Sequence, residues 1–361
     1  MHAKNSIRMS AQSQVDDLRS ELRALLRAQE GFDLIQRQRF SLKLFRFQAE
    51  FNQVYSDYVR LRGIDPHEVD AIEAIPFLPV ETFQRHAVHV FPSNWEGDYQ
   101  FKSSGTTGGL PSIHHIDEVN WYNEMALRGF GTFFSKNTHR KFLGLLPGYL
   151  ERSDSSLVHM VRNFILDSGV AEPEASFFME NWPALEAQLD ACVIENYTGD
   201  IFLIGVTHAL LQWVASLSDA TIARWSQLNL RVFETGGMKG KGPEYVRSEV
   251  HRRLGRLPKD GVIGSEYGMT ELLSQAWSKG KGLFRTPPWM QVLVGALDDP
   301  GEWKDCGQQG RLHIIDLANI ASCAFLSTGD LGRCHDDGTF EVLGRYDHAE
   351  VRGCNLMAFD L

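Results

Sequence analysis

Apolar side chains recur at helical spacing in the first part of the chain. Residues 11–29 alternate apolar and charged positions in this way, which predicts an amphipathic helix. Residues 38–62 show the same spacing with many aromatic side chains and predict a second helix. An aromatic stripe of this kind normally packs in a core, so we expect both helices to be structural. The prolines of Ile75-Pro-Phe-Leu-Pro79 then predict an extended connector into the main body.

Strand and helix patterns alternate from about residue 140. Short apolar runs predict strands at 141–146, 201–206, 230–234 and 262–264. Between them, helical spacing predicts helices over 153–167, from about 207 and from about 243. This alternation is typical of an α/β fold with parallel sheets flanked by helices.

The pattern becomes β-rich after about residue 289. Strands are predicted at 289–294, 310–316, 323–326 and 339–343. The chain is therefore expected to contain an N-terminal helical segment (1–70), a main body (71–343, β-rich from about 289) and a short tail (344–361).

Composition narrows the function classes. The 361 residues carry a net charge of −10 and no basic stripe, so nucleic acid is not expected as a partner. No apolar run is long enough for a membrane span, and the first residues contain no secretory h-region. The cysteines are odd in number and form no CxxC, which favours a reduced, cytoplasmic protein. They are Cys192, Cys306, Cys323, Cys334 and Cys354.

A loop rich in glycine and hydroxyl groups is the first candidate for chemistry. It runs from Phe101 to Ser112 and includes Ser103, Ser104, Gly105, Thr106, Thr107 and Gly108. Closely spaced amides and hydroxyls suit a triphosphate. The loop lacks the Gly-Lys-Ser/Thr ending of a Walker A motif. On its own it is also typical of a polar surface turn.

Three later segments could complete a nucleotide site. Tyr267-Gly-Met-Thr-Glu271 offers a ring for a base, a hydroxyl for a phosphate and a carboxylate for Mg²⁺. Thr328-Gly-Asp330 predicts a tight turn whose carboxylate could bind ribose hydroxyls, and Gly344-Arg-Tyr-Asp347 adds a cation. Ligands of parallel sheets bind at the carboxyl ends of strands. We therefore expect the glycine-rich turns near 105, after 234 and after 264 to share one cleft.

In this order, the segments resemble the motifs of the adenylate-forming superfamily of acyl-CoA synthetases, luciferases and peptide-synthetase adenylation domains. The resemblance extends from about residue 70. More narrowly, the chain resembles the LuxE-type acyl-protein synthetases, long-chain fatty acid–protein ligases that serve bacterial fatty acid reductase. The narrower match is carried by Ile75–Val80, Leu146–Glu151 with Ser155-Ser156, Tyr267–Ser274 and Arg352–Asn355.

The resemblance implies the large N-terminal lobe of an adenylate-forming enzyme, with ATP and Mg²⁺ as cofactors and a fatty acid as substrate. The loop at 103–108 would hold the triphosphate, Glu271 the Mg²⁺ and Thr270 the α-phosphate. Tyr267 and Gly268 would bind adenine together with Gly236 and Gly237. Asp330 and Arg345 would hold the ribose.

Two departures from the superfamily shape the functional hypothesis. Ser112 stands where a lysine usually follows the loop, and Lys102, Lys239 or Lys241 could supply the charge instead. By this resemblance the given residues end just past the superfamily's hinge, so we expect its usual C-terminal lobe to be essentially absent. The narrower resemblance implies that Cys354 then receives the acyl group as a thioester for an acyl reductase partner. Arg352 or His348 could activate this thiol.

Other interpretations stay open. An acyl- or aryl-CoA ligase of the phenylacetate type would not need Cys354. A non-catalytic nucleotide- or acyl-binding subunit would catalyse no reaction. The histidines His114, His115 and His208 are interpreted as hydrogen-bonded structural residues, although His115 could help to position a carboxylate.

Overall fold

The computed structural model describes most of the chain in two compact units. The described residues are 2–28, 32–95, 97–104, 110–134, 139–148, 151–179, 181–236, 245–297 and 301–346, with side chains from residue 11 onward. Unit 1 comprises Met1–Trp95 and Pro288–Leu361, and unit 2 comprises Glu96–Pro287.

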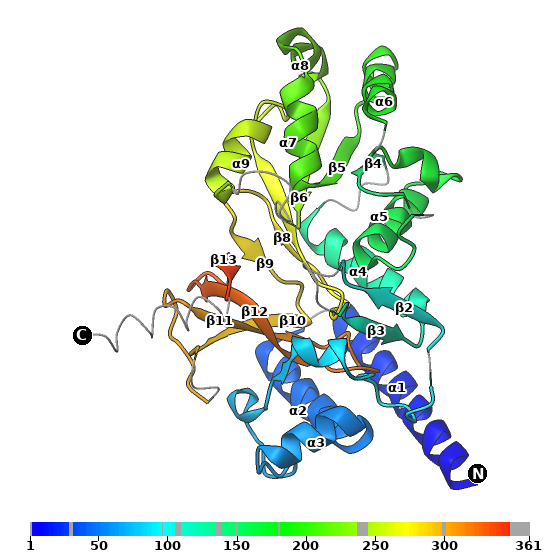
Figure 1. Cartoon of the computed structure of the whole chain (residues 1–361), viewed down its shortest axis with the longest axis vertical. Helices are drawn as coiled ribbons and strands as arrows, with labels where there is room; N and C mark the ends of the chain where they lie inside the picture. The colour runs from blue at the N-terminus through cyan, green and yellow to red at the C-terminus, as the bar shows by residue number, and fades with distance from the viewer. Residues whose placement is uncertain are drawn as a thin grey trace. The chain divides into compact units, whose positions relative to one another are not determined.

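Unit 1 begins with three helices (Figure 1), which are α1 (His2–Arg27), α2 (Leu34–Phe51) and α3 (Gln53–Leu61). The prediction of a single helix over 38–62 was wrong, because the chain breaks at Asn52. The Asn52 side chain accepts a hydrogen bond from the amide of Tyr55 at 3.1 Å and caps α3. Its amide group donates to the carbonyl of Ser322 at 3.0 Å. The short polar side chain of Asn52 can bond to nearby backbone groups in place of the helical hydrogen bonds. The cap on α3 and the bond to the distant Ser322 carbonyl stabilise the break in the helix.

The β-rich part of unit 1 is a sheet in the order β10-β11-β12-β13, with antiparallel neighbours. Its strands are β10 (Met290–Gly295), β11 (Gly310–Asp316), β12 (Phe325–Cys334) and β13 (Phe340–Arg345), and β1 (Leu78–Pro79) pairs in parallel with β12. The buried Gln48 of α2 joins the helices to this part. Its amide group donates to the carbonyls of Asn319 and Ile320, and its oxygen accepts from the amide of Ala324. Short 3-10 helices, η1 (Ile72–Ala74) and η2 (Val80–Gln84), lie on either side of β1.

The segment Thr328–Asp330 lies inside β12, so the predicted tight turn was wrong. Strand β12 pairs with β11 on one side and with β13 on the other. The hydroxyl of Thr328 also donates to the carbonyl of Leu312 at 2.8 Å. The segment itself is a bulge, because the register with β11 passes from Ser327 to Leu331 and skips the three residues between them. The Thr328 bond to Leu312 and the amide of Tyr346, which donates to the Gly329 carbonyl at 2.7 Å, hold this irregular segment within the strand.

Unit 2 is built on a mixed sheet in the order β9-β8-β7-β6-β5-β4 (Figure 1). Neighbouring strands from β4 to β7 are parallel, whereas β8 and β9 join antiparallel. The strands are β4 (Arg140–Leu145), β5 (Asp200–Val206), β6 (Asn229–Thr235), β7 (Ile263–Tyr267), β8 (Ala276–Ser278) and β9 (Phe284–Arg285). A separate hairpin consists of β2 (Tyr99–Lys102) and β3 (Ile113–Ile116). The strand predicted at 262–264 continues to Tyr267, because β7 gains β8 as a neighbour.

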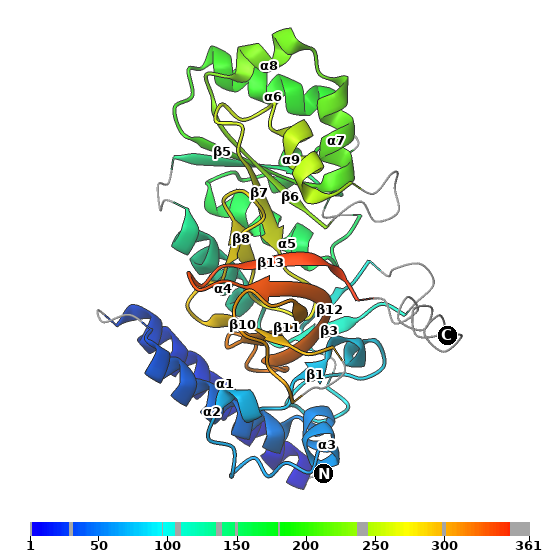
Figure 2. The same ribbon diagram turned by 90° about the vertical axis from the view of Figure 1, so that its left-hand side faces the viewer.

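Helices cover both faces of this sheet (Figure 2). They are α4 (Val119–Phe133), α5 (Ser156–Asp167), α6 (Trp182–Ile194), α7 (Thr207–Ser216), α8 (Asp219–Trp225) and α9 (Arg247–Leu254), with the 3-10 helix η3 (Pro173–Ser176). Gly144 of β4 faces Val161 of α5, whereas Gly205 of β5 faces Leu210 of α7. Gly144 pairs with Ile204, the residue before Gly205, so α5 and α7 pack on opposite faces.

An aromatic cluster fills the core of unit 2 beneath α4 and α5. The rings of Phe142 and Phe202 stack at 5.1 Å on neighbouring strands. Phe130 of α4 contacts both rings and also Trp277 of β8. These side chains are fully buried or nearly so, and they fix the strands whose carboxyl ends carry the predicted site.

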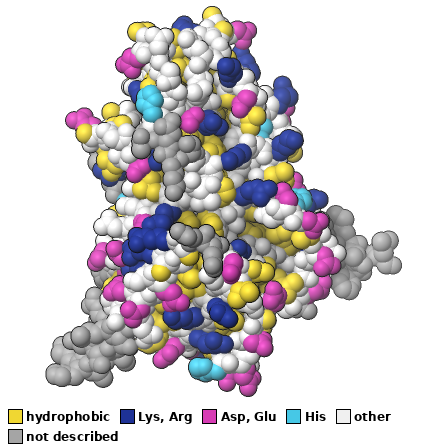
Figure 3. Space-filling model, turned by 180° about the vertical axis from the view of Figure 1, so that it is seen from behind, with side chains coloured by type: hydrophobic (Ala, Val, Ile, Leu, Met, Phe, Trp, Pro, Cys, Tyr) yellow, Lys and Arg dark blue, Asp and Glu magenta, His cyan; other side chains and the backbone are white. Residues whose placement is uncertain are grey.

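The surface carries both signs of charge. On the face shown in Figure 3, Lys and Arg side chains are interspersed with Asp and Glu side chains. Among the described residues, no helix is both long enough and apolar enough to cross a membrane.

Candidate active site

The predicted phosphate loop connects the two strands of the β2–β3 hairpin. The amide of Ser103 donates to the carbonyl of Ser112 at 3.0 Å, and the amide of Ser112 donates to the Ser103 hydroxyl oxygen at 2.9 Å. The Ser103 hydroxyl can still donate its own proton to a ligand. Ser104 is exposed, whereas Gly105, Thr106, Thr107 and Gly108 lie outside the described residues. Ser112, which replaces the expected lysine, is buried and closes the base of the loop.

A histidine of α5 packs against strand β2 among aromatic side chains. The ring of His159 on α5 lies against Phe101 at 5.4 Å, Tyr99 at 5.3 Å and Tyr122 at 5.7 Å. Its Nε2 atom is 2.9 Å from the side-chain oxygen of Asn123. Burial, together with the nearby charge of Arg162, lowers the pKa of His159 to about 4.

This histidine makes the stability of the chain depend on pH. The unfolded chain protonates His159 near pH 6.5, whereas the folded chain resists protonation until about pH 4. Its contribution is therefore complete above pH 6.5 and is lost as the pH falls towards 4. We expect the free energy of unfolding to fall by roughly 2 kcal/mol between pH 7 and pH 5 from this group. Urea unfolding of His159→Gln should show a smaller fall, and the exposed His86→Gln should behave like the original chain. An unchanged pH dependence in His159→Gln would contradict the assignment.

A buried hydrogen bond brings the loop hairpin to the second predicted motif. The Nδ1 atom of His114 on β3 is 2.8 Å from the carbonyl oxygen of Thr270, across a sequence separation of 156 residues. His114 is 1% exposed. This contact confirms the interpretation of His114 as a hydrogen-bonded structural residue. It also places Ser103 and Thr270 on connected elements of the same unit.

The Tyr267–Glu271 segment begins at the carboxyl end of β7. The ring of Tyr267 packs edge-on against Phe284 with centroids 5.9 Å apart. A Cβ at Gly268 would come within 2.5 Å of the Glu266 carboxylate, so a larger residue there would have to displace the end of that side chain. Thr270 and Glu271 are both buried, at 8% and 6% exposure. The segment therefore offers a supported ring and a buried carboxylate close together in sequence.

Glu234 is a buried carboxylate that the sequence analysis did not single out. It accepts hydrogen bonds from the hydroxyls of Thr207 at 2.8 Å and Ser265 at 2.6 Å. Two basic groups approach the same side chain: His251 Nε2 at 3.6 Å and Arg247 Nε at 3.9 Å. Burial alone would raise the pKa of Glu234. The hydrogen bonds from His251, Ser265 and Thr207 and the charge of Arg247 together lower it, so the carboxylate is ionised.

This network joins the carboxyl ends of three parallel strands. Thr207 directly follows β5, Glu234 lies near the end of β6, and Ser265 belongs to β7. Gly236, two residues beyond Glu234, has a φ of 75°, which disfavours any side chain there. Gly237 lies outside the described residues. In the sequence, the only sign of this network was a carboxylate, Glu234, at the end of the predicted strand 230–234.

The two predicted ribose residues are neighbours in unit 1. Asp330 of β12 pairs in register with Arg345 of β13. The Nε atom of Arg345 is 3.5 Å from the Asp330 carboxylate, and the arginine side chain is largely exposed. The amide of Asp330 donates to the hydroxyl of Thr328 at 3.1 Å. The structure therefore joins the predicted carboxylate and cation into one pair.

The described residues contain no group of three or more His, Cys, Asp or Glu side chains that could hold a metal ion. Mg²⁺ in nucleotide sites is usually held by one or two carboxylates together with substrate phosphates. The single carboxylate of Glu271 fits that requirement.

The described cysteines are poor candidates for the predicted nucleophile. Burial raises the pKa of Cys323 to about 12 and that of Cys334 to about 11. Burial also raises the pKa of Cys192, and a hydrogen bond with Asp336 raises that of the exposed Cys306. A raised pKa keeps a thiol protonated and weakly nucleophilic at neutral pH. Cys354 lies outside the described residues.

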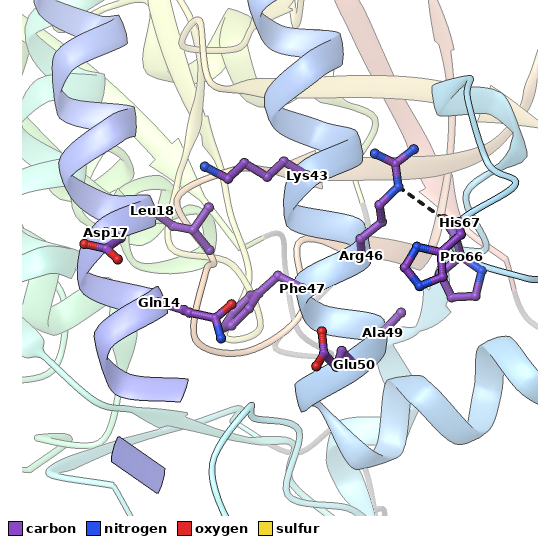
Figure 4. Close-up of a pocket in the computed structure, with 10 residues that line it drawn as sticks. All are labelled: Gln14, Asp17, Leu18, Lys43, Arg46, Phe47, Ala49, Glu50, Pro66 and His67. Carbon is purple, nitrogen blue, oxygen red and sulfur yellow. Dashed lines mark hydrogen bonds between the residues drawn. The ribbon is translucent and has the colours of Figure 1, made fainter. Parts of the chain in front are cut away.

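A cavity of about 480 Å³ lies among the N-terminal helices of unit 1 (Figure 4). Gln14, Asp17 and Leu18 line it from α1, and other residues line it from α2 and the loop at 66–67. Arg46 is tied down there by hydrogen bonds to the carbonyls of Pro66 and Val69. None of the predicted site residues is among the residues that line this cavity.

Comparison with known proteins shows what this arrangement of elements resembles. No protein-family model and no curated protein matches the chain. Among solved structures, 2-hydroxyisobutyryl-CoA ligase in the postadenylation state, in complex with 2-HIB-AMP, matches with a TM-score of 0.59 and 11% identity, covering 86% of this chain and 68% of the ligase. The chain has the fold of that ligase. This confirms the predicted α/β fold, that of the N-terminal lobe of adenylate-forming enzymes.

Two further structures agree. An open conformation of 2-hydroxyisobutyryl-CoA ligase, in complex with 2-HIB-AMP and CoA, matches with a TM-score of 0.58 and 12% identity over 87% of this chain and 71% of the ligase. The ATP-bound RpMatB-BxBclM chimera B1 matches with a TM-score of 0.51 and 15% identity over 71% of this chain. This chain spans about half of the chimera, 49% of its length.

Proposed function

We propose that this chain is an adenylate-forming ligase that activates a fatty acid with ATP and transfers the acyl group to Cys354 as a thioester. The observation that carries the adenylation step is the 2.8 Å hydrogen bond from His114 to the Thr270 carbonyl. It joins the loop hairpin to the Tyr267–Glu271 segment within one unit. The order of the sequence motifs and the shared fold support the same reaction.

The proposed roles follow from the chemistry of each side chain. The Ser103 hydroxyl and the loop that follows it hold the triphosphate. The buried Glu271 holds Mg²⁺, which neutralises phosphate charge when bound. Tyr267, beside Gly268 and Gly236, packs against adenine. Asp330 accepts hydrogen bonds from ribose hydroxyls, with Arg345 beside it.

The first step makes the carboxylate reactive. A carboxylate oxygen of the fatty acid attacks the α-phosphorus of ATP, and the bond from that phosphorus to the bridging oxygen of pyrophosphate breaks. The products are an acyl-adenylate and pyrophosphate. Thr270 contributes by donating a hydrogen bond to the α-phosphate as charge shifts, which stabilises the transition state by position rather than by covalent chemistry.

The second step moves the acyl group to sulfur. The Cys354 thiolate attacks the acyl carbonyl carbon, the bond from that carbon to the phosphate oxygen breaks, and AMP leaves with the electron pair. The thioester on the enzyme is a form that an acyl reductase partner can use. The raised pKa values of the described cysteines favour Cys354 for this role.

A second candidate is an acyl- or aryl-CoA ligase. It is favoured by the likeness to a CoA ligase whose open form was captured with 2-HIB-AMP and CoA. In this alternative CoA, rather than Cys354, attacks the same acyl-adenylate. The first step and its residues are unchanged.

The adenylation step is tested by ATP–pyrophosphate exchange with radiolabelled pyrophosphate. We expect exchange that depends on a fatty acid and on Mg²⁺, with a preferred chain length within a series of acids. Exchange followed by CoA consumption would select the CoA ligase. Absence of exchange with fatty acids, aryl acids and hydroxy acids would instead select a non-catalytic nucleotide- or acyl-binding subunit.

A further inference from the structure

The buried Glu234 network lies beside the residues assigned to adenine, and none of the proposed steps uses it. We propose that Glu234 is a positioning residue that holds Tyr267 in place for nucleotide binding. It would act through Arg247 and Phe284. This inference rests on the proposed function, because it takes Tyr267 as the adenine-binding side chain.

The connection runs through three contacts within unit 2. The Arg247 Nε atom is 3.9 Å from the Glu234 carboxylate. The Arg247 guanidinium lies over the ring of Phe284, 5.2 Å from its centroid. Phe284 in turn packs edge-on against Tyr267, with ring centroids 5.9 Å apart. The negative charge of Glu234 therefore holds the cation that covers the ring on which Tyr267 rests.

A second set of hydrogen bonds fixes the strand that carries Tyr267. The hydroxyl of Ser265, two residues before Tyr267, donates to Glu234 at 2.6 Å. The hydroxyl of Thr235, next to Glu234, donates to Glu266 at 2.5 Å. Both bonds join the carboxyl ends of β6 and β7. The Ser265 bond makes the main chain before Tyr267 depend on Glu234, whereas the Thr235 bond uses the separate carboxylate of Glu266.

A charge on the buried Glu234 destabilises the fold unless neighbouring groups compensate for it. A buried carboxylate loses favourable hydration, which its partners must offset. Two hydroxyls satisfy its hydrogen bonds, and a neutral amide could do nearly the same. A neutral imidazole of His251 can donate to an amide oxygen as well, so only the attraction to the Arg247 guanidinium requires the charge. Glu234→Gln therefore keeps the shape and most of the hydrogen bonding but releases Arg247.

The test measures AMP binding by calorimetry and the KM for ATP in pyrophosphate exchange. We expect Glu234→Gln to raise the Kd for AMP and the KM for ATP by about 5- to 10-fold, with kcat changed by less than about twofold. Arg247→Gln should give the same shift. The double variant should be no weaker than either single variant, because both remove one pathway. The matched control is Glu249→Gln. Glu249 is a carboxylate on α9, the helix of Arg247, and it pairs with Arg252 and Arg253, so this variant should leave both constants unchanged.

The possible outcomes separate positioning from a structural role. If the variants only reduce the amount of folded protein, the apparent kcat falls while Kd and KM stay the same. That result would overturn the proposal. Unchanged binding in both variants, or additive losses in the double variant, would do the same. Should Glu234→Gln not fold, the partly exposed Arg247→Gln decides the matter alone. An original chain that binds no AMP would overturn the nucleotide site itself, whereas binding without any effect of the variants overturns only the positioning role.

Discussion

Replacing Glu271 with glutamine is expected to lower ATP–pyrophosphate exchange by about 10²- to 10³-fold. The carboxylate is assigned to Mg²⁺ on the triphosphate, and metal neutralisation of phosphate charge contributes several kcal/mol to the transition state. Glutamine has nearly the same shape, so the buried side chain should still pack at its 6% exposed site. The rate is measured at saturating ATP over a range of Mg²⁺ concentrations.

Two comparisons and one contrary outcome make this result specific. AMP binding by Glu271→Gln should stay close to that of the original chain, because adenine and ribose are assigned to other residues. Glu195→Gln, an exposed carboxylate at the end of α6, should keep full exchange. Full exchange by Glu271→Gln itself would remove Glu271 from the reaction.

Replacing Cys354 with serine is expected to abolish the acyl-thioester while leaving exchange within about twofold of the original rate. Adenylation needs no thiol, whereas transfer needs a nucleophile far stronger than a serine hydroxyl at neutral pH. Mass spectrometry after incubation with ATP, Mg²⁺ and the preferred acid should show one acyl group on the original chain. Hydroxylamine should remove it. The Cys354→Ser chain should gain none.

The matched control for this experiment is Cys306→Ser, since Cys306 is exposed and carries no proposed role. It should be acylated as fully as the original chain. A Cys354→Ser chain that still gains a stable acyl group would exclude Cys354 as the acceptor. Acyl-CoA formation by either chain in the presence of CoA would favour the CoA ligase.

Most secondary structure of the two units could be predicted from local pattern. The apolar run at 201–206 predicted β5, because a buried parallel strand reads as a continuous apolar run, and the segment 230–234 predicted β6. The errors were at places where distant partners outweigh local preference. Asn52 ends α2 because the Ser322 carbonyl accepts a hydrogen bond from the Asn52 side-chain amide. Thr328–Asp330 stays within β12 as a bulge, because Leu312 of β11 accepts from the Thr328 hydroxyl and Asp330 pairs with Arg345 of β13.

The candidate site also contains residues that the sequence predicted and contacts that only the structure revealed. Sequence order alone predicted Ser103, Tyr267, Thr270, Glu271, Asp330 and Arg345 as a set, because each belongs to a short motif with a recognisable chemistry. It gave no sign that Ser112 closes the loop base. The charge at the end of the predicted strand 230–234 marked Glu234, but not the two hydroxyls and two basic groups that contact it. The Glu234 contacts join residues well separated in the chain, and no local pattern encodes which residues meet there.

The sequence by itself therefore determined the α/β class, the order of the elements and the motifs that bear the chemistry. Helical and strand periodicity and short glycine- and hydroxyl-rich turns are local properties, readable without a fold. Only the tertiary structure decided which of these motifs meet. The His114–Thr270 hydrogen bond and the Asp330–Arg345 pair depend on strand register. Register is fixed by how the buried faces of distant segments pack, and that is a property of the whole fold.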